Sequence, residues 1–386
     1  MKLARQLEQL VAAALISMAS GVVLAGPAVP ATPTASTAPT QALDLDAALK
    51  VALQNATVPA MGALVIRSGA VVATAVSGKR AADQADAVQP DDVWHLGSNG
   101  KAMTAAMIAR LVERGVLSWD APLSTLLPEL AAGMQPGYRS VTLRDLFAHQ
   151  AGLNENIAEE YLPKFMADQR ALPVQRVDYA RIALAQTPGY AAGTADGYSN
   201  NGPLVAAVAA ERATGMSYEQ LMQREVFDPL QMRSARFGAT HRGQPLGHLQ
   251  GKPKEGRDAD NPPALAPAGE IHMSLQDWAK FAIDQMQGEL GQGKLLKPAS
   301  YKMLHDAARE GGKFGLGWRR QPSMAGMTGP FLSHSGSNEF WFAVIALRPS
   351  TLDGALVVAN AGPDVKANAA VADVVKQIVK TFPALP

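Results

Sequence analysis

The segment LGSNGKAMTAAMIARLVERG, residues 96–115, combines a helical pattern with a compact group of polar residues at its start. Its apolar residues recur at helical spacing and Gly115 provides the expected stop, so we expect a long helix over Leu96–Arg114. Ser98 and Lys101 are three positions apart, and residues at that spacing lie on one face of a helix. The Ser98 hydroxyl and the Lys101 amine are therefore expected to converge.

A serine beside a lysine can serve as a nucleophile with its base. An amine that is shielded from water is more readily neutral and can take the hydroxyl proton. The start of a helix also offers exposed N–H groups and the positive end of the helix dipole. However, serine is a common N-cap and lysine is common in helices, so this S-x-x-K spacing alone leaves the structural interpretation open.

A second polar cluster, Tyr198-Ser-Asn200, lies in a glycine-rich stretch just before a helix predicted over Pro203–Thr214. A tyrosine phenol near a cation can transfer protons. Asn200 can hold Lys101 or bind a substrate amide, although a turn with an N-cap asparagine is the structural alternative.

A third cluster, His334-Ser-Gly-Ser337, ends an apolar run that predicts a strand. Glycine lets another backbone or a ligand approach a strand closely. The Ser337 N–H could then pair with the Ser98 N–H as an oxyanion hole. A β-turn is the structural alternative here.

The rest of the chain predicts strands at both ends and helices between them. Two β-rich runs separated by Ser68-Gly-Ala70 indicate a hairpin, and four runs after residue 313 indicate strands, the first over Phe314–Trp318. We therefore expect an α+β fold: one antiparallel sheet built from both chain ends, flanked by helices, with a mainly helical insertion at about residues 100–300. Further helices are predicted over Leu43–Ala56, Val141–His149, Leu275–Gln287 and Val365–Phe382.

The N-terminus predicts export. A basic start with Lys2 and Arg5 precedes an uncharged apolar segment, and small residues precede a plausible cleavage point after Ala25. We expect residues 1–25 to be a signal peptide, residues 26–42 a Pro/Ala/Thr-rich leader, and residues 43–386 the folded domain that carries the three polar clusters. The mature protein would be periplasmic or secreted, with no stable membrane span.

Composition narrows the classes of function. The formal net charge is +1 among 386 residues, so no basic field favours nucleic acid, and the absence of cysteine removes thiolate metal sites, disulfides and thiol nucleophiles. The seven histidines form no metal-binding spacing such as H-E-x-x-H. We expect neither a metal nor a cofactor.

Taken together, the three clusters resemble the motifs of the class C β-lactamase-like serine hydrolases, which include β-lactamases, DD-peptidases, D-aminopeptidases and family VIII esterases. Four other stretches support the resemblance, which covers about residues 44–380. They are VTLRDLFAHQAGL at 141–153, FDPLQM at 227–232, APAGE at 266–270 and FGLGW at 314–318.

The resemblance implies roles for single residues. Ser98 would be the acylated nucleophile, Lys101 its base, and Tyr198 the proton carrier to the leaving group and from water. Substrate-binding residues would be Asn200, His334, Ser335, Gly336 and Ser337, with the amides of Ser98 and Ser337 holding the oxyanion. Trp341 would line either the pocket or the core.

One departure concerns the third motif. Class C β-lactamases have lysine where this chain has His334, and a histidine with the usual pKa of about 6.5 is only partly charged at pH 7. The resemblance therefore favours an esterase or D-peptidase over an efficient β-lactamase. The substrate would be a small molecule or a peptidoglycan-like peptide.

Four alternatives exist, and the first three belong to other classes of protein. An α/β-hydrolase requires G-x-S-x-G, and the nearest match, Gly197-Tyr-Ser-Asn-Asn201, lacks the last glycine. A metallohydrolase requires a ligand cluster that the sequence does not suggest. A non-catalytic cell-envelope binding protein on the same fold is a further alternative, as is a true β-lactamase.

Overall fold

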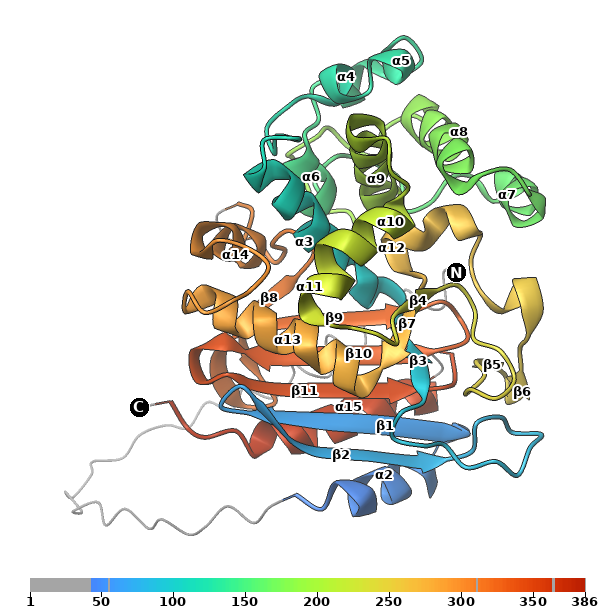
Figure 1. Cartoon of the computed structure of the whole chain (residues 1–386), viewed down its shortest axis with the longest axis vertical. Helices are drawn as coiled ribbons and strands as arrows, with labels where there is room; N and C mark the ends of the chain where they lie inside the picture. The colour runs from blue at the N-terminus through green and yellow to red at the C-terminus, as the bar shows by residue number, and fades with distance from the viewer. Residues whose placement is uncertain (1–42, 55, 310–311, 363–364, 386) are drawn as a thin grey trace, which may run out of the picture.

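Strands from both ends of the described chain form one six-stranded antiparallel sheet (Figure 1). The N-terminal hairpin joins the C-terminal strands directly, with Met61 opposite Ala359. The strand order is β2 (Ala70–Gly78), β1 (Ala60–Arg67), β11 (Asp353–Ala359), β10 (Phe342–Arg348), β9 (Met327–Ser337) and β8 (Arg319–Met324). The predicted α+β fold with an antiparallel sheet from both chain ends is confirmed.

The structure is a computed structural model that describes residues 43–54, 56–309, 312–362 and 365–385. The predicted signal peptide and leader lie outside the described residues. None of the helices described has the length and apolar character needed to span a membrane.

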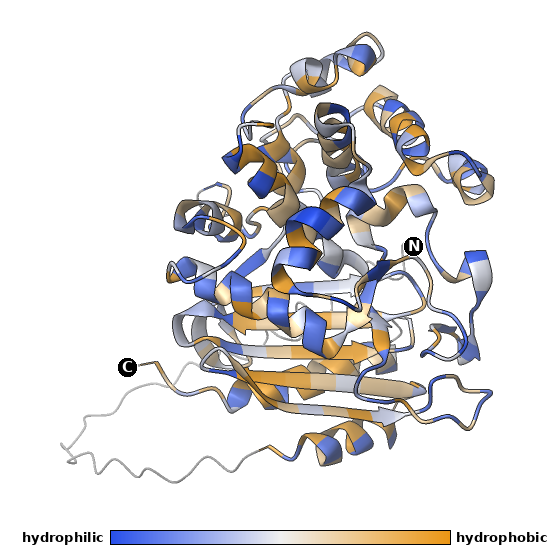
Figure 2. Cartoon of the chain, in the orientation of Figure 1, coloured by the Kyte–Doolittle hydropathy of each residue, from blue (hydrophilic) through white to orange (hydrophobic). Residues whose placement is uncertain are grey.

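Both faces of the central strands β1, β10 and β11 are buried, although antiparallel sheets often leave one face in water. Because side chains alternate along a strand, Leu356 packs in the core shared with the helical part, whereas Val357 packs in the core beneath the terminal helices. Helix α13 (Leu275–Glu289) covers the first face, and α2 (Leu45–Gln54) and α15 (Val365–Lys380) cover the second. Figure 2 shows the central strands largely in the hydrophobic colours.

The helical part of the chain lies to one side of the sheet, above it in Figure 1. Its longest members, α3, α8 and α9, pack together, α9 between the other two. The helices in this part are α3 (Gly100–Glu113), α4 (Leu123–Leu126), α5 (Pro128–Ala131), α6 (Leu143–Phe147), α7 (Leu162–Ala167), α8 (Leu172–Ala185), α9 (Asn201–Thr214), α10 (Tyr218–Met222), α11 (Asp228–Leu230), α12 (Ala266–Gly269) and α14 (Pro298–His305).

Short strands also occur within and beside the helical part. The sequence did not predict β3, which comes directly before the Ser98 segment and pairs with β7. These strands are β3 (Val93–His95), β4 (Arg236–Phe237), β5 (His248–Leu249), β6 (Lys252–Pro253) and β7 (Ile271–Ser274).

Two local predictions are wrong. The helix expected from Leu96 begins at Gly100, after a 3-10 turn over Gly97–Asn99, because Gly97 has a left-handed φ of 51°. The strand expected over Phe314–Trp318 does not form. Gly317, with φ 85°, turns the backbone against α3, where an added methyl group would lie 3.0 Å from the Lys101 carbonyl oxygen, and β8 begins only at Arg319.

Candidate active site

Ser98 lies in the 3-10 turn between β3 and α3. The turn is fastened to the large sheet by Asn99, whose Nδ2 donates to Leu96 O at 2.7 Å and to Ala343 O at 3.2 Å. Neither the turn nor α3 has a side-chain capping hydrogen bond at its start. The Ser98 hydroxyl is therefore not used as a helix cap.

Lys101 is fully buried and its amine reaches the Ser98 hydroxyl. The Lys101 Nζ lies 2.9 Å from Ser98 Oγ, 2.7 Å from Asn200 Oδ1 and 2.6 Å from Ala268 O. The expected convergence of Ser98 and Lys101 is present. The amine is thus surrounded by residues from three segments that are distant in the sequence: the start of α3, the residue before α9, and α12.

Tyr198 approaches the same hydroxyl from the loop before α9. Its phenol donates to Ser98 Oγ at 2.7 Å, and the Lys101 Nζ lies 4.9 Å from the centre of its ring. The Ser98 oxygen is thus within hydrogen-bonding distance of both an amine and a phenol, the two groups that the motifs predicted.

The loop that carries Tyr198 is anchored to the segment after α6. Ser199 N–H donates to His149 Nδ1 at 3.2 Å, and the Ser199 hydroxyl donates to Asn154 O at 2.7 Å. Gly197 N–H also donates to His149 O, at 2.8 Å. Ser199, the middle residue of the motif, therefore orients the loop rather than facing Ser98.

Asn200 occupies the N-cap position of α9 but its side chain makes no capping bond. Its Oδ1 accepts from Lys101, and its Nδ2 donates to Asn156 Oδ1 at 2.9 Å. The amide is oriented from both ends, which favours the interpretation of Asn200 as a lysine-holding residue over the N-cap alternative.

His149 was not among the predicted site residues, although its segment supported the family resemblance. Its ring lies 4.6 Å from that of Tyr198 and 5.3 Å from that of Phe314. Burial, with the positive charge of Lys101, lowers the pKa of His149 well below its usual value. Because Nδ1 accepts from Ser199, the proton of the neutral ring is on Nε2. Asn156 and the Ala268 carbonyl were also missed. Ala268 lies in the APAGE stretch that supported the resemblance, whereas no sequence pattern identifies Asn156.

The third motif lies within β9, so the β-turn alternative is wrong. Here the strand and the Ser98 turn are in backbone contact. A methyl group added at Gly336 would lie 2.2 Å from Leu96 O and 2.6 Å from Ser98 N, and one added at Gly97 would lie 2.3 Å from Ser337 N. Only glycine permits this approach, which brings the backbone N–H groups of Ser98 and Ser337 to the same contact.

His334 differs from the expectation of a partly charged imidazole. Its Nδ1 lies 2.6 Å from Ser335 O, which places a proton on that nitrogen. Burial lowers the pKa of His334 to about 3, and the charges of Lys101 and Arg319 act in the same direction. The ring is therefore neutral at pH 7.

Trp341 belongs to the core. It is 1% exposed, and its ring meets that of Trp94 edge to face at 6.1 Å. Of the two interpretations from the sequence, the structure favours the core residue. No group of three or more metal-ligating side chains occurs among residues that the structure describes.

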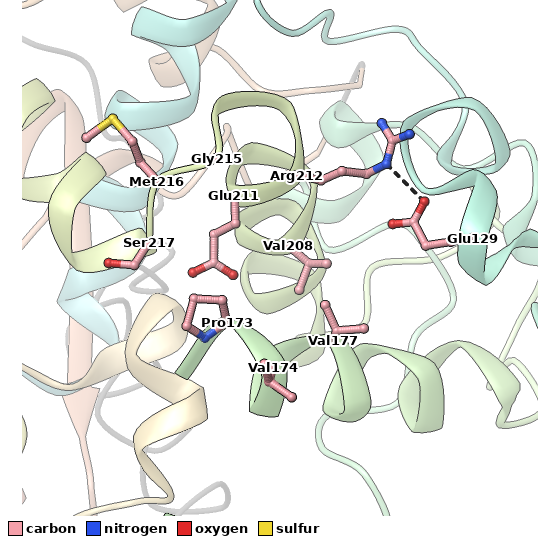
Figure 3. A pocket seen from close by; sticks show the side chains of 10 residues that line it. All are labelled: Glu129, Pro173, Val174, Val177, Val208, Glu211, Arg212, Gly215, Met216 and Ser217. Carbon is pink, nitrogen blue, oxygen red and sulfur yellow. Dashed lines mark hydrogen bonds and ion pairs between the residues drawn. The ribbon is translucent and has the colours of Figure 1, made fainter. Parts of the chain in front are cut away.

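A groove that contains none of the predicted site residues lies between α8 and α9 (Figure 3). Its floor is apolar and an ion pair between Arg212 and Glu129, at 2.9 Å, borders it. The hydroxyl in its lining, that of Ser217, caps α10. The groove therefore offers no nucleophile and base comparable to those around Ser98.

The Beta-lactamase family model matches residues 45–380. The chain belongs to this family. The predicted membership of the β-lactamase-like serine hydrolase group is thereby confirmed.

Several curated proteins resemble this chain at moderate sequence identity. A putative penicillin-binding protein, PbpX, from Bacillus subtilis is 30% identical over 250 residues, covering 63% of this chain and 57% of the relative. Esterase EstB from Burkholderia gladioli is 31% identical over 202 residues, half of each chain. This chain thus spans about half of the length of these curated relatives. The octameric penicillin-binding protein homologue from Pyrococcus abyssi shares the fold, with a TM-score of 0.69 and 21% identity over 86% of this chain and 76% of that one.

The depressed pKa of His334 predicts a measurable acid sensitivity. Unfolded histidine binds a proton near pH 6.5, whereas folded His334 does so only near pH 3. Protonation therefore favours the unfolded chain between these values, and stability falls as the pH falls through 6.5. His334→Asn should retain up to about 2 kcal/mol more of its pH 7 stability at pH 5 than the native protein retains. Urea unfolding at both pH values measures this.

The same experiment contains its control. Between pH 7.5 and 8.5 His334 is neutral in both the folded and the unfolded chain, so the variant and the native protein should change in parallel. Equal loss of stability at pH 5 in both proteins would contradict the neutral assignment.

Proposed function

We propose that this protein is an exported serine hydrolase that acts through an acyl-enzyme on Ser98. The observation that carries the proposal is that Ser98 Oγ lies 2.9 Å from the Lys101 amine and 2.7 Å from the Tyr198 phenol. A nucleophile within hydrogen-bonding reach of a base and of a proton-carrying group is the signature of covalent catalysis. The family membership supports the same chemistry.

The partners of Lys101 indicate how the proton moves. Asn200 Oδ1 and Ala268 O can only accept hydrogen bonds. A neutral amine has two N–H bonds, and if these go to the two acceptors, its lone pair faces Ser98 Oγ. The protonated amine donates to all three oxygens. The surroundings therefore suit both states of Lys101, and the difference between the states is the one proton exchanged with Ser98.

The reaction would then proceed in two steps. In the first, Ser98 Oγ bonds to the substrate carbonyl carbon as its proton passes to Lys101, and the N–H groups of Ser98 and Ser337 bind the oxyanion. Collapse breaks the bond to the leaving group, which receives the proton through Tyr198. In the second, water attacks the acyl carbon while one of its protons passes through Tyr198 to Lys101. Collapse breaks the bond between the acyl carbon and Ser98 Oγ, which takes the proton from Lys101, so the acid is released and the Ser98 hydroxyl and neutral amine are restored.

The neutral state of His334 bears on the substrate. An imidazole with a pKa of about 3 provides no fixed positive charge for a substrate carboxylate. Neutral acyl groups are therefore favoured over the anionic β-lactams, and we propose a small ester or related amide as substrate. Relatives that bear the names Esterase EstB and Lovastatin esterase support an ester. D-amino-acid peptides of the peptidoglycan type are the second substrate class.

Localisation to the periplasm, or secretion, is part of the proposal. It depends on the basic and apolar pattern of residues 1–25 and the small residues before the cleavage point.

Ser98 should be the residue that carries the acyl group. Treatment with a fluorophosphonate probe should add one label, and peptide mass spectrometry should locate it on Ser98. Ser98→Ala should lose the label, whereas a control at the exposed Ser118, Ser118→Ala, should keep it. Label on another serine, or none on the native protein, would count against the assignment.

Tyr198→Phe should lower kcat for p-nitrophenyl butyrate by about 10²-fold, the usual size of a general acid–base effect. KM should change little, because the phenol acts on protons rather than on the acyl group. A matched control is Tyr190→Phe, whose phenol donates to His149 O at 2.9 Å and belongs to the neighbouring loop. The control should cost about 1 kcal/mol of stability but keep most of the turnover. Equal turnover in the two variants would remove Tyr198 from the mechanism.

His334→Lys should shift the substrate preference toward anions. A hydrogen bond to a charged group contributes about 1.5–3 kcal/mol, so the ratio of kcat/KM for nitrocefin to that for p-nitrophenyl butyrate should rise about tenfold or more. His334→Gln, which is neutral, is the matched control and should leave the ratio near its native value. If the ratio does not rise in the lysine variant, the charge of this residue does not select the substrate.

A further inference from the structure

A buried carboxylate, that of Asp260, joins the two backbone segments that meet beside Ser98. Asp260 follows the 3-10 turn Gly256–Ala259, in the loop before α12, and is 8% exposed. Its Oδ2 lies 2.9 Å from His95 Nε2, and its Oδ1 accepts from Asn338 Nδ2 at 2.9 Å and from Asn261 N–H at 2.9 Å.

His95 connects this carboxylate to the nucleophile turn. Its ring is fully buried, and its Nδ1 accepts from Gly97 N–H at 3.1 Å. A neutral imidazole has one donor and one acceptor nitrogen, so the proton lies on Nε2 and is donated to Asp260. The contact with Asp260 therefore orients the His95 ring, and the His95 ring in turn holds the backbone at Gly97, directly before the Ser98 N–H.

Asn338 connects the same carboxylate to the end of β9. While its Nδ2 donates to Asp260, its Oδ1 accepts from Phe340 N–H at 3.1 Å. Both ends of the amide are thereby used and its orientation is set. Asn338 directly follows Ser337, whose N–H is the second donor of the proposed oxyanion hole.

We propose that Asp260 is a positioning residue that sets the relative placement of the Ser98 and Ser337 N–H groups. The inference rests on the proposed function, because it concerns the oxyanion hole of that reaction. Asp260 acts through His95 and Asn338, so it is not a catalytic residue. It also ties the loop before α12 to the Ser98 turn through His95.

The chemistry of the network requires a carboxylate at this position. Asp260 accepts from donors on both of its oxygens, and an ionised carboxylate offers only acceptors. Asparagine has the same shape but one oxygen, so its NH2 group must face either His95 Nε2–H or Asn338 Nδ2. His95 can remove the first conflict only by moving its proton to Nδ1, which would then oppose Gly97 N–H. Asn338 can remove the second only by giving up its bond to Phe340.

Two other buried titratable side chains, Glu270 and His272, interact electrostatically with Asp260. Burial, and the negative charge of Asp260, raise the pKa of Glu270 well above its usual value. Burial lowers the pKa of His272 to about 4. His272 is therefore neutral at pH 7, and Glu270 carries no positive charge in either protonation state, so neither side chain is an ionic partner for Asp260.

The test is Asp260→Asn, assayed with p-nitrophenyl butyrate and with phenylboronic acid as an inhibitor. A displaced oxyanion hole should lower kcat by about 10- to 100-fold with KM within about twofold, because small displacements of catalytic donors have effects of this size. The Ki of phenylboronic acid should rise by at least about tenfold, since its tetrahedral adduct on Ser98 places an oxygen in the same hole. Partial unfolding would lower kcat but would not change this Ki.

The control is Asp284→Asn, which alters another buried carboxylate, 3% exposed, that accepts from Tyr301 and from the Lys294 N–H in the α13–α14 region. It should lower stability without raising the Ki. A second variant, His95→Phe, keeps an aromatic ring beside Trp341 but removes both nitrogens. It should reproduce the Ki change, and the double variant should be no worse than the more affected single variant, since both changes break one network.

The outcomes separate this inference from the proposed function. If the native protein hydrolyses the ester and is labelled on Ser98 but the Asp260→Asn variant keeps its kcat and Ki within about twofold, the positioning role is overturned and the hydrolase proposal stands. A native protein with neither turnover nor label overturns both. If Asp260→Asn does not fold, His95→Phe decides by the same criteria, and failure of both variants to fold means that the network serves the fold and the inference is wrong.

Discussion

The close contact between the Ser98 turn and strand β9 is the constraint on which the site depends. Gly97 and Gly336 face each other across it, and a methyl group on either would lie within 2.3 Å of the opposite backbone. Because neither segment has a side chain here, the backbone N–H groups of Ser98 and Ser337 meet in one place. The large sheet, whose central strands are buried on both faces, provides one side of this contact. Helix α3 begins directly after the Ser98 turn and places the Lys101 amine beside the Ser98 hydroxyl.

Burial gives the site an unusual electrostatic character. Two histidines, His149 and His334, lie close to the Lys101 charge, and burial together with that charge lowers the pKa of both. They are neutral at pH 7 and contribute shape and hydrogen bonds rather than charge. The amine of Lys101 is correspondingly held by oxygen atoms of Asn200 and Ala268. These features are the basis of the proposed proton exchange between the Lys101 amine and the Ser98 hydroxyl and of the proposed preference for uncharged acyl groups.

The elements that sequence patterns predicted well are those with strong local periodicity. The terminal hairpin, α9 and α15 follow from alternation or helical spacing, and their predicted bounds differ from the observed ones by a few residues. The failure over Phe314–Trp318 has a physical reason: its apolar residues resemble those of a strand, but Gly317 adopts a left-handed conformation against α3. The short strand β3 was missed because three residues carry too little pattern.

The pairing of Ser98 with Lys101 is a local property of the chain, since three residues of spacing bring both side chains to one side wherever a helix begins. The family motifs, and a sheet built from strands at both ends of the chain, can likewise be recognised from the residues alone. Four features of the site arise only in the folded chain. They are the contact of Tyr198 with Ser98, the hydrogen bond between Asn156 and Asn200, the neutral state of His334, and the network that connects Asp260 to the segments of both N–H groups. These features depend on contacts between residues tens to hundreds of positions apart and on the removal of water from the side chains involved. Long-range contacts and desolvation produce no periodic pattern in the sequence, so sequence analysis does not detect them.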